Sequence, residues 1–176
     1  MKINFGCGSK LKTGFLGVDI LQLPGVDIVH NLDNFPYPFD DNSVDEIWMD
    51  QVLEHLNDPL KTVEELYRIS KNDAIITIGV PYFRSFYAYI DPTHKNFFSM
   101  NWFNYFDPTH IFCQKYQYSK AAFQISKIEI NREDINKSIF SKILIYYAKK
   151  KPTSYELRLS HLFPLNSLTF HLKVIK

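Results

Sequence analysis

Two glycines and a carboxylate near the N-terminus have the spacing of a nucleoside-binding site. Gly6 and Gly8 flank Cys7 directly after a short apolar run, and Asp19 follows eleven residues after Gly8. Glycine lets the backbone turn tightly and lets a ligand approach it closely. A carboxylate at the end of a second strand can accept hydrogen bonds from both hydroxyls of a ribose. The pattern favours a bound nucleoside over the plain alternative, a tight turn followed by a solvated carboxylate.

The same residues depart from the fingerprint of dinucleotide-binding proteins. That fingerprint has a third glycine three residues after the second one, and this sequence has Leu11 there. Its acidic residue also comes about 20 residues further along the chain, so Asp19 comes early. The short interval leaves little room for a helix between the first two strands. We therefore expect the first crossover helix to be shortened or absent.

The elements that must position these residues alternate between strands and turns in the first half of the chain. Apolar and β-branched runs predict strands at residues 2–5, 15–20, 27–30, 44–49 and 74–80. Two prolines and a polar cluster predict a loop at residues 34–43. Asp58 and Pro59 predict the start of a helix, as its N-cap and its first residue. This order predicts an α/β fold that binds ligands at the carboxyl ends of its strands.

The second half of the chain has a less regular pattern. Between residues 83 and 113 aromatic and polar residues mix without a clean period, which predicts a loop-rich segment. Lys149, Lys150, Lys151 and Pro152 predict a basic turn. Further strands are predicted at residues 120–130, 139–147 and 168–175.

Composition and charge exclude several classes of protein. Hydrophobic residues make up 45% of the 176 residues and charged residues 22%, which is ordinary for a globular domain. The net charge of +1 provides no polyelectrolyte attraction for nucleic acid or an anionic membrane. No apolar run approaches the roughly 18 residues of a membrane span. Cys7 and Cys113 form neither a disulfide framework nor a metal-binding spacing, so we expect free thiols, a cytoplasmic protein and no metal.

Five segments carry a longer pattern in a fixed order. They are Ile-Asn-Phe-Gly-Cys-Gly at residues 3–8, Gly-Phe-Leu-Gly-Val-Asp at 14–19, a proline- and aspartate-rich stretch at 35–48, Val-Leu-Glu-His-Leu at 52–56 and Glu-Leu-Tyr-Arg-Ile at 65–69. As a set they resemble the class I S-adenosylmethionine-dependent methyltransferases, and most closely the short type 11-like group. Several members of that group belong to cell-surface polysaccharide pathways. The resemblance covers residues 2–81 well and the rest of the chain loosely.

The resemblance implies a Rossmann-like methyltransferase sheet, mostly parallel with an antiparallel last strand, and S-adenosylmethionine as cofactor. It places Gly6, Cys7 and Gly8 against the methionine end of the cofactor. It places Asp19 on the ribose, with Ile20 near the adenine. It also implies a single domain over residues 1–176, in which 1–81 bind the cofactor and 82–176 form an acceptor-side lid and terminal strands.

Two further pairs of residues receive cofactor roles from the resemblance. Asn31 and Leu32 match the adenine-edge position, where the family often has Asp. An amide oxygen can still accept a hydrogen bond from the adenine amino group. Asp50 and Gln51 match the end of the fourth strand, beside the sulfonium.

The acceptor side is expected in the segment after the fifth strand. Methyl transfer from a sulfonium needs a general base only when the acceptor is a neutral hydroxyl. The candidates are His94, Asp91, Tyr82 and, less favoured, His110, with His94 first because an imidazole titrates near neutral pH. His94 ends an Asp-Pro-Thr-His tetrapeptide that recurs at residues 107–110, and the pair Glu54-His55 is a less favoured acid–base candidate. The alternative for these residues is a structural role in loops.

Three functions remain open from the sequence. The first is methyl transfer to a small molecule or sugar. The second is a non-catalytic methyltransferase-fold partner or regulatory protein, which the missing helix suggests. The third, an NAD-dependent oxidoreductase or epimerase, is disfavoured by Leu11 in place of the third glycine. The aromatic residues between 82 and 112 suit either a sugar-stacking surface or the contact of a homodimer.

Overall fold

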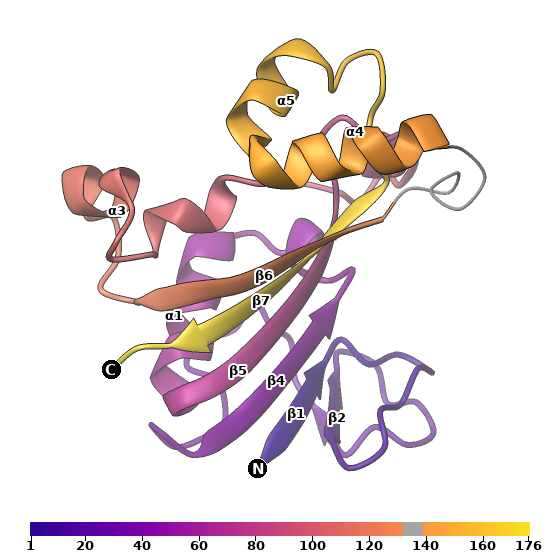
Figure 1. Cartoon of the computed structure of the whole chain (residues 1–176). Helices are drawn as coiled ribbons and strands as arrows, with labels where there is room; N and C mark the ends of the chain where they lie inside the picture. Colours follow the sequence, from indigo (N-terminus) through magenta and orange to yellow (C-terminus); the bar gives the residue numbers. More distant parts are fainter. Residues whose placement is uncertain (132–138) are drawn as a thin grey trace.

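One sheet of seven strands organises the molecule (Figure 1). The computed structural model describes residues 1–131 and 139–176. The strands are β1 (Lys2–Phe5), β2 (Leu16–Asp19), β3 (Ile28–Val29), β4 (Val44–Asp50), β5 (Ser70–Pro81), β6 (Phe123–Asn131) and β7 (Ser167–Val174). Their order is β3-β2-β1-β4-β5-β7-β6; β7 is antiparallel to both its neighbours and the other pairs are parallel. The predicted Rossmann-like sheet is confirmed.

The helix α1 (Pro59–Ile69) connects β4 to β5 and covers one face of the sheet. It begins as predicted, because the Asp58 carboxylate accepts a hydrogen bond from the Lys61 N–H at 2.9 Å and Pro59 is the first residue. Val63, Leu66 and Ile69 lie on its buried face and belong to the hydrophobic core. The helix thereby fixes the loop after β4, which carries part of the site.

The first crossover helix is absent, as expected. Residues 6–43 contain no helix, and the structure describes all of them. Ile3 and Ile47 point into the core, so the alternating side chains of Lys2, Glu46 and Trp48 lie on the opposite face of the sheet. That face shows no covering helix over β1, β4 and β5 (Figure 1). An ion pair joins Lys2 Nζ to Glu46 Oε2 at 2.7 Å there.

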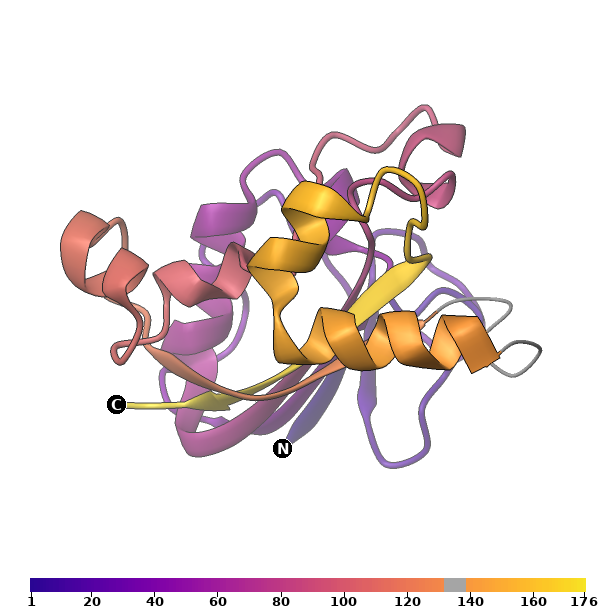
Figure 2. The ribbon, with the colours of Figure 1, turned by 45° about the horizontal axis from the view of Figure 1, so that its top comes forward.

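One prediction for the second half is wrong. Residues 139–147, predicted as a strand, belong to the helix α4 (Ile139–Lys150). A run of apolar residues does not distinguish a strand from a helix by its period alone, but the buried residues Ser141, Leu144, Ile145 and Ala148 recur every three or four positions. The predicted basic turn is also shorter than expected, because a single residue, Lys151, separates the end of α4 from the start of α5 (Pro152–Arg158). The two helices pack against each other (Figure 2).

The segment between β5 and β6 divides into an exposed part and a buried part. It contains the short helices α2 (Tyr87–Ile90) and α3 (Ile111–Tyr116) and the 3-10 helix η2 (Trp102–Tyr105). Phe98, Phe103 and Phe106 are buried in the core, and the Phe103 ring lies 4.8 Å from the ring of Phe170 on β7. Residues 98–106 of this segment therefore pack on the sheet, and the acceptor-side lid stays a prediction.

Candidate functional site

A cleft of about 230 Å³ opens at the carboxyl ends of β1 to β4. Strand β1 lies between β2 and β4, so the chain connections diverge at this point. Open α/β sheets bind ligands at such a switch point. The residues that line the cleft are Gly6, Asp19, Ile20, His30, Asn31, Leu32, Asp33, Val52, His55 and Leu56.

The turn after β1 forms one wall of the cleft. Gly6 has a φ of +62°, and a Cβ at this position would lie 2.2 Å from Val52 Cγ2. Gly8 has a φ of +48°, and a Cβ there would meet no atom within 4 Å. Both glycines therefore adopt a backbone conformation that other residues rarely take, and the space beside Gly8 stays open for a ligand. Cys7 between them is buried, and burial raises the pKa of its thiol, so only its backbone is available to a ligand.

The carboxylate of Asp19 joins the turn after β1 to the end of β2. Its Oδ2 accepts the Gly8 N–H at 2.8 Å, and its Oδ1 accepts the Leu21 N–H at 3.0 Å. The residue also lines the cleft, so lone pairs remain for hydroxyl donors of a ligand. Ile20 beside it is exposed. This carboxylate has both a structural role and the position predicted for a ribose contact.

The residues after β3 form the opposite wall. Asn31 uses its Oδ1 to accept the Asp33 N–H at 3.0 Å, and Leu32 is buried against the core. Asp33 accepts two hydrogen bonds from Asn57, from its backbone N–H at 2.8 Å and its Nδ2 at 2.7 Å. This wall is thereby fixed to the loop that leads into α1.

Three titratable side chains meet beside the cleft. They are Glu54 and His55, on the 3-10 helix η1 (Leu53–His55), and His94, in the turn after α2. A candidate ligand atom from each lies within 4.8 Å of those of the other two, and the two imidazole rings are 4.7 Å apart at their centres. Burial raises the pKa of Glu54 to about 8, with the charges of Asp50 and Asp91 adding to the effect. Burial lowers the pKa of His55, and the charge of His94 lowers it further.

Backbone hydrogen bonds hold the two segments of this cluster together. The carbonyl of Glu54 accepts the N–H groups of Lys95 at 2.8 Å and Asn96 at 3.1 Å. Asn96 Nδ2 also donates to the carbonyl of Leu56 at 2.6 Å. The turn with His94 is therefore fastened directly to the loop after β4, next to the cleft.

Comparison with known proteins points to the methyltransferases. No curated protein sequence matches this chain. A family profile described as a methyltransferase domain matches residues 21–78, which include β3, β4 and α1. Residues 21–78 therefore match a methyltransferase-domain family, which agrees with the class I fold of the sheet. S-adenosylmethionine is the methyl donor that this family implies.

Solved methyltransferase structures share the fold of this domain over almost its whole length. An S-adenosylmethionine-dependent methyltransferase from Archaeoglobus fulgidus matches 98% of this chain and 85% of its own, with a TM-score of 0.57 and 22% identity. One from Aquifex aeolicus matches 99% and 81%, with a TM-score of 0.54 and 14% identity. Phosphoethanolamine N-methyltransferase 2 of Haemonchus contortus, solved with phosphomonomethylethanolamine and S-adenosylhomocysteine, matches 99% and 48%, with a TM-score of 0.56 and 14% identity.

The structure of this methyltransferase brings most of the predicted cofactor residues to one cleft. Gly6, Asp19, Ile20, Asn31 and Leu32 line it directly. The sequence missed His30, Val52 and Leu56 as lining residues, because nothing in their spacing marks them. For His55 the sequence predicts a role only in an acid–base pair with Glu54.

Four predicted cofactor residues lie outside the set that lines the cleft, namely Cys7 and Gly8 in the turn after β1 and Asp50 and Gln51 at the end of β4. Asp50 is the last residue of β4 and Gln51 follows it, and both are exposed. Asp50 Oδ1 lies over Gly79, where a Cβ would come within 2.1 Å of it. Gln51 has a φ of +56°, and its N–H donates to the Gly79 carbonyl at 2.9 Å. Their cofactor roles stay predictions.

The predicted catalytic residues of the methyltransferase do not all meet. His94 lies at the cleft edge, and Asp91 reaches it indirectly through Thr93. Tyr82 is fully buried, is outside the cleft lining, and has its pKa raised chiefly by burial. The structure therefore gives Tyr82 no access to an acceptor in this cleft.

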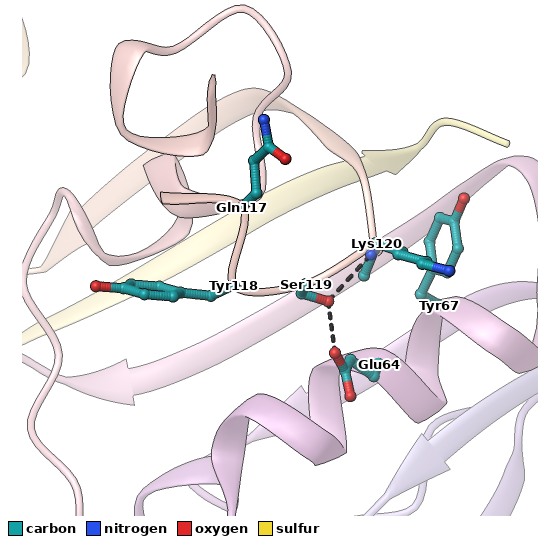
Figure 3. Close-up of a pocket in the computed structure, with 7 residues that line it drawn as sticks. Glu64, Tyr67, Gln117, Tyr118, Ser119 and Lys120 are labelled. Carbon is teal, nitrogen blue, oxygen red and sulfur yellow. Dashed lines mark hydrogen bonds between the residues drawn. The ribbon is translucent and has the colours of Figure 1, made fainter. Parts of the chain in front are cut away.

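A larger cavity lies at the other end of the molecule. It has a volume of about 470 Å³ and lies between α1 and the segment before β6 (Figure 3). Ser119 Oγ donates to Glu64 Oε1 at 2.7 Å across it, and Tyr67 and Lys120 also line it. These residues lie toward the amino ends of the parallel strands, and none was predicted to bind cofactor. The described part of the chain contains no helix long and apolar enough to cross a membrane.

Proposed function

We propose that this protein transfers a methyl group from S-adenosylmethionine to a small molecule or sugar, with the cofactor in the cleft at the ends of β1 to β4. The observation that carries the proposal is the arrangement of Gly8 and Asp19. The N–H of Gly8, a left-handed glycine with open space beside it, donates to Asp19, and this strand-end carboxylate lines the cleft with lone pairs to spare. Both features suit a nucleoside whose ribose donates two hydroxyls.

Each wall of the cleft has a distinct task in this proposal. Asp19 accepts the ribose hydroxyls, and Ile20 and Leu32 contact the adenine. The amide of Asn31 lies at the adenine edge. Gly6 and Gly8 leave room for the methionine end, with Asp50 and Gln51 at the far rim. Backbone N–H groups that donate to the carboxylates of Asp19 and Asp33 hold the two walls of the cleft in place.

The bound cofactor supplies an electrophilic methyl group, which an acceptor lone pair attacks in line as the carbon–sulfur bond breaks. The protein contributes position and removes a proton when the acceptor is a neutral hydroxyl. His94 donates through Nδ1 to the Ala88 carbonyl at 3.1 Å, so its Nε2 lone pair is the one open to an acceptor proton. Asp91 acts through Thr93 and His55 as a positioning group.

The surface around His94 supports an acceptor with apolar or sugar faces. Phe86 is 68% exposed and Tyr89 is 65% exposed on or beside α2. The Tyr89 ring stacks on Phe97 with the ring centres 5.0 Å apart. Exposed aromatic rings stack on sugar faces and pack against apolar acceptors. The same surface is the contact that we propose for a homodimer.

We also propose that the protein is a cytoplasmic enzyme of cell-surface polysaccharide synthesis. The support is the sequence resemblance over residues 2–81 and the free state of Cys7 and Cys113. We also keep the division into a cofactor-binding part at 1–81 and an acceptor-side part at 82–176.

The test is incubation of the purified protein with methyl-labelled S-adenosylmethionine and a cell extract, followed by identification of the labelled product. A labelled small molecule or sugar nucleotide is the expected result. The matched control is the Gly8→Val variant, which places a branched side chain in the open space and should label nothing. Label only in protein or nucleic acid would contradict the acceptor class.

A further inference from the structure

The strongest unexplained feature is a buried carboxylate without a partner. Glu54 is 0% exposed, and neither of its side-chain oxygens has a hydrogen-bond partner among the described residues. Burying a charge without a compensating partner is costly, and native proteins pair such groups or use them to bind a cation. The nearest candidates to share a cation with Glu54 are His55 and His94, each with a ligand atom within 4.8 Å.

The hydrogen bonds of the two histidines fix where their lone pairs point. His94 Nδ1 lies 3.1 Å from the Ala88 carbonyl, which can only accept, so this nitrogen carries the proton. His55 Nδ1 lies 2.9 Å from Thr93 Oγ1, which itself donates to Asp91 Oδ1 at 2.6 Å. His55 Nδ1 must therefore donate as well. In the neutral form both rings keep a bare Nε2, the atom that binds metal.

These outer contacts are the ones that metal-binding histidines use. Such histidines donate their other ring N–H to a backbone carbonyl or toward a carboxylate, which fixes the tautomer and the ring orientation. The chain provides one of each, with Ala88 behind His94 and the Thr93–Asp91 pair behind His55. We propose that Glu54, His55 and His94 bind a divalent transition-metal ion beside the cofactor cleft.

The donor set selects the class of ion. Two imidazole nitrogens and one carboxylate oxygen suit Zn²⁺, Fe²⁺ or Co²⁺, whereas Mg²⁺ and Ca²⁺ prefer oxygen ligands only. Three protein ligands leave further coordination positions open. Because His55 also lines the cleft, an acceptor oxygen in such a position lies next to the bound cofactor. With the ion bound, His94 Nε2 coordinates it and no longer accepts a proton, so the ion replaces His94 in activating the acceptor oxygen. This role of the ion rests on the proposed function, whereas the binding of the ion does not.

The repeated tetrapeptide provides a matched control within the chain. In both copies the Thr N–H and hydroxyl donate to the Asp carboxylate, at 2.8 and 2.6 Å for Thr93 and at 2.9 and 2.7 Å for Thr109. The two histidines differ in their tautomer, because His110 Nδ1 accepts the Phe112 N–H at 3.2 Å and caps α3. The same turn thus serves the metal cluster in one copy and a helix end in the other.

The test is a titration of the chelator-treated full-length protein with Co²⁺, followed by visible absorption, and with Zn²⁺ in competition with a chromophoric chelator. We expect one Co²⁺ per chain, displaced by Zn²⁺ and unaffected by Mg²⁺ at about 1 mM. Glu54→Gln and His94→Gln should each weaken binding at least tenfold. His110→Gln should leave it within twofold, and Thr93→Val, which removes only an outer contact, should weaken it about tenfold.

Three results would overturn the site. They are the absence of a stoichiometric Co²⁺ spectrum in the wild type, equal binding by His94→Gln and wild type, and equal losses in His94→Gln and His110→Gln. Thr93→Val keeps the proposal testable if a ligand variant fails to fold, because it leaves all three ligands in place. S-adenosylmethionine binding is measured separately in the presence of chelator. If the protein binds the cofactor and not the metal, only the metal site is refuted. If it binds the metal and not the cofactor, only the proposed function is refuted.

Discussion

Replacing Asp19 by alanine tests the cofactor role of this carboxylate against its structural role. The carboxylate accepts the Gly8 N–H at 2.8 Å and the Leu21 N–H at 3.0 Å, and it lines the cleft. Asp19→Ala therefore removes two contacts within the protein and the proposed contacts to the ribose. Asp19→Asn keeps one acceptor oxygen, but its NH₂ group then faces one of the two backbone N–H donors.

The two effects have different expected sizes. Hydrogen bonds to charged groups contribute about 1.5–3 kcal/mol. Loss of the ribose contact should therefore weaken S-adenosylmethionine binding by about 10- to 150-fold. Loss of two partly exposed backbone contacts should lower the free energy of unfolding by about 1–2 kcal/mol. That corresponds to a fall in melting temperature of roughly 2–8 °C for a chain of this size.

Asp27→Ala is the matched control for the structural part. Asp27 Oδ2 accepts the Gly17 N–H at 2.7 Å on the neighbouring strand, and the residue does not line the cleft. We expect a comparable loss of melting temperature and a dissociation constant within twofold of the wild type. Isothermal titration calorimetry with S-adenosylhomocysteine measures the affinity, and thermal unfolding measures the stability. An Asp19→Ala variant with unchanged affinity, or equal weakening in both variants, would refute the reasoning.

Three further predictions follow from single residues. Gly8→Val should weaken cofactor binding at least tenfold and also lower the melting temperature, because a β-branched residue at a φ of +48° is strained; unchanged calorimetric affinity would contradict this. Tyr82→Phe should leave methyl transfer within threefold, since the side chain is fully buried, and a loss of a hundredfold would restore it as a catalytic candidate. Burial alone would raise the pKa of Glu65, but hydrogen bonds from Arg68 and from the Tyr37 N–H outweigh it and hold the pKa below its usual value. This stabilisation is present above the pKa of Glu65 in the unfolded chain and is lost as the pH falls through its lower pKa in the folded protein. Below about pH 4.5, the free energy of unfolding of Glu65→Gln should therefore decrease less steeply with falling pH than that of the wild type.

The parts of the fold that depend on local chemistry could be predicted from the sequence. Asp58 and Pro59 define the start of α1 because capping needs only neighbouring residues. The short interval between Gly8 and Asp19 excludes a full helix by length alone. Residues 139–147 could not be assigned in this way, because their apolar run fits a buried strand and a helix equally well, and tertiary packing decides between them.

The grouping of residues around the cleft could be predicted from the sequence, whereas the meeting of Glu54 with His94 could not. Gly6, Gly8 and Asp19 follow strands directly, so the parallel sheet brings them together. Glu54 and His94 are 40 positions apart in the sequence, and they meet because the Lys95 and Asn96 N–H groups bind the Glu54 carbonyl. No periodicity reveals such a contact. The unpaired carboxylate of Glu54 is a property of the folded chain only.

The central claim is that the cleft between β1, β2 and β4 binds S-adenosylmethionine. The most direct measurement is calorimetric titration of the folded wild-type protein with S-adenosylmethionine, S-adenosylhomocysteine and NAD. We predict one site per chain for the two methyl-series ligands, competition between them, and no heat from NAD. A folded sample that binds neither methyl-series ligand, or from which NAD displaces them, would contradict the account.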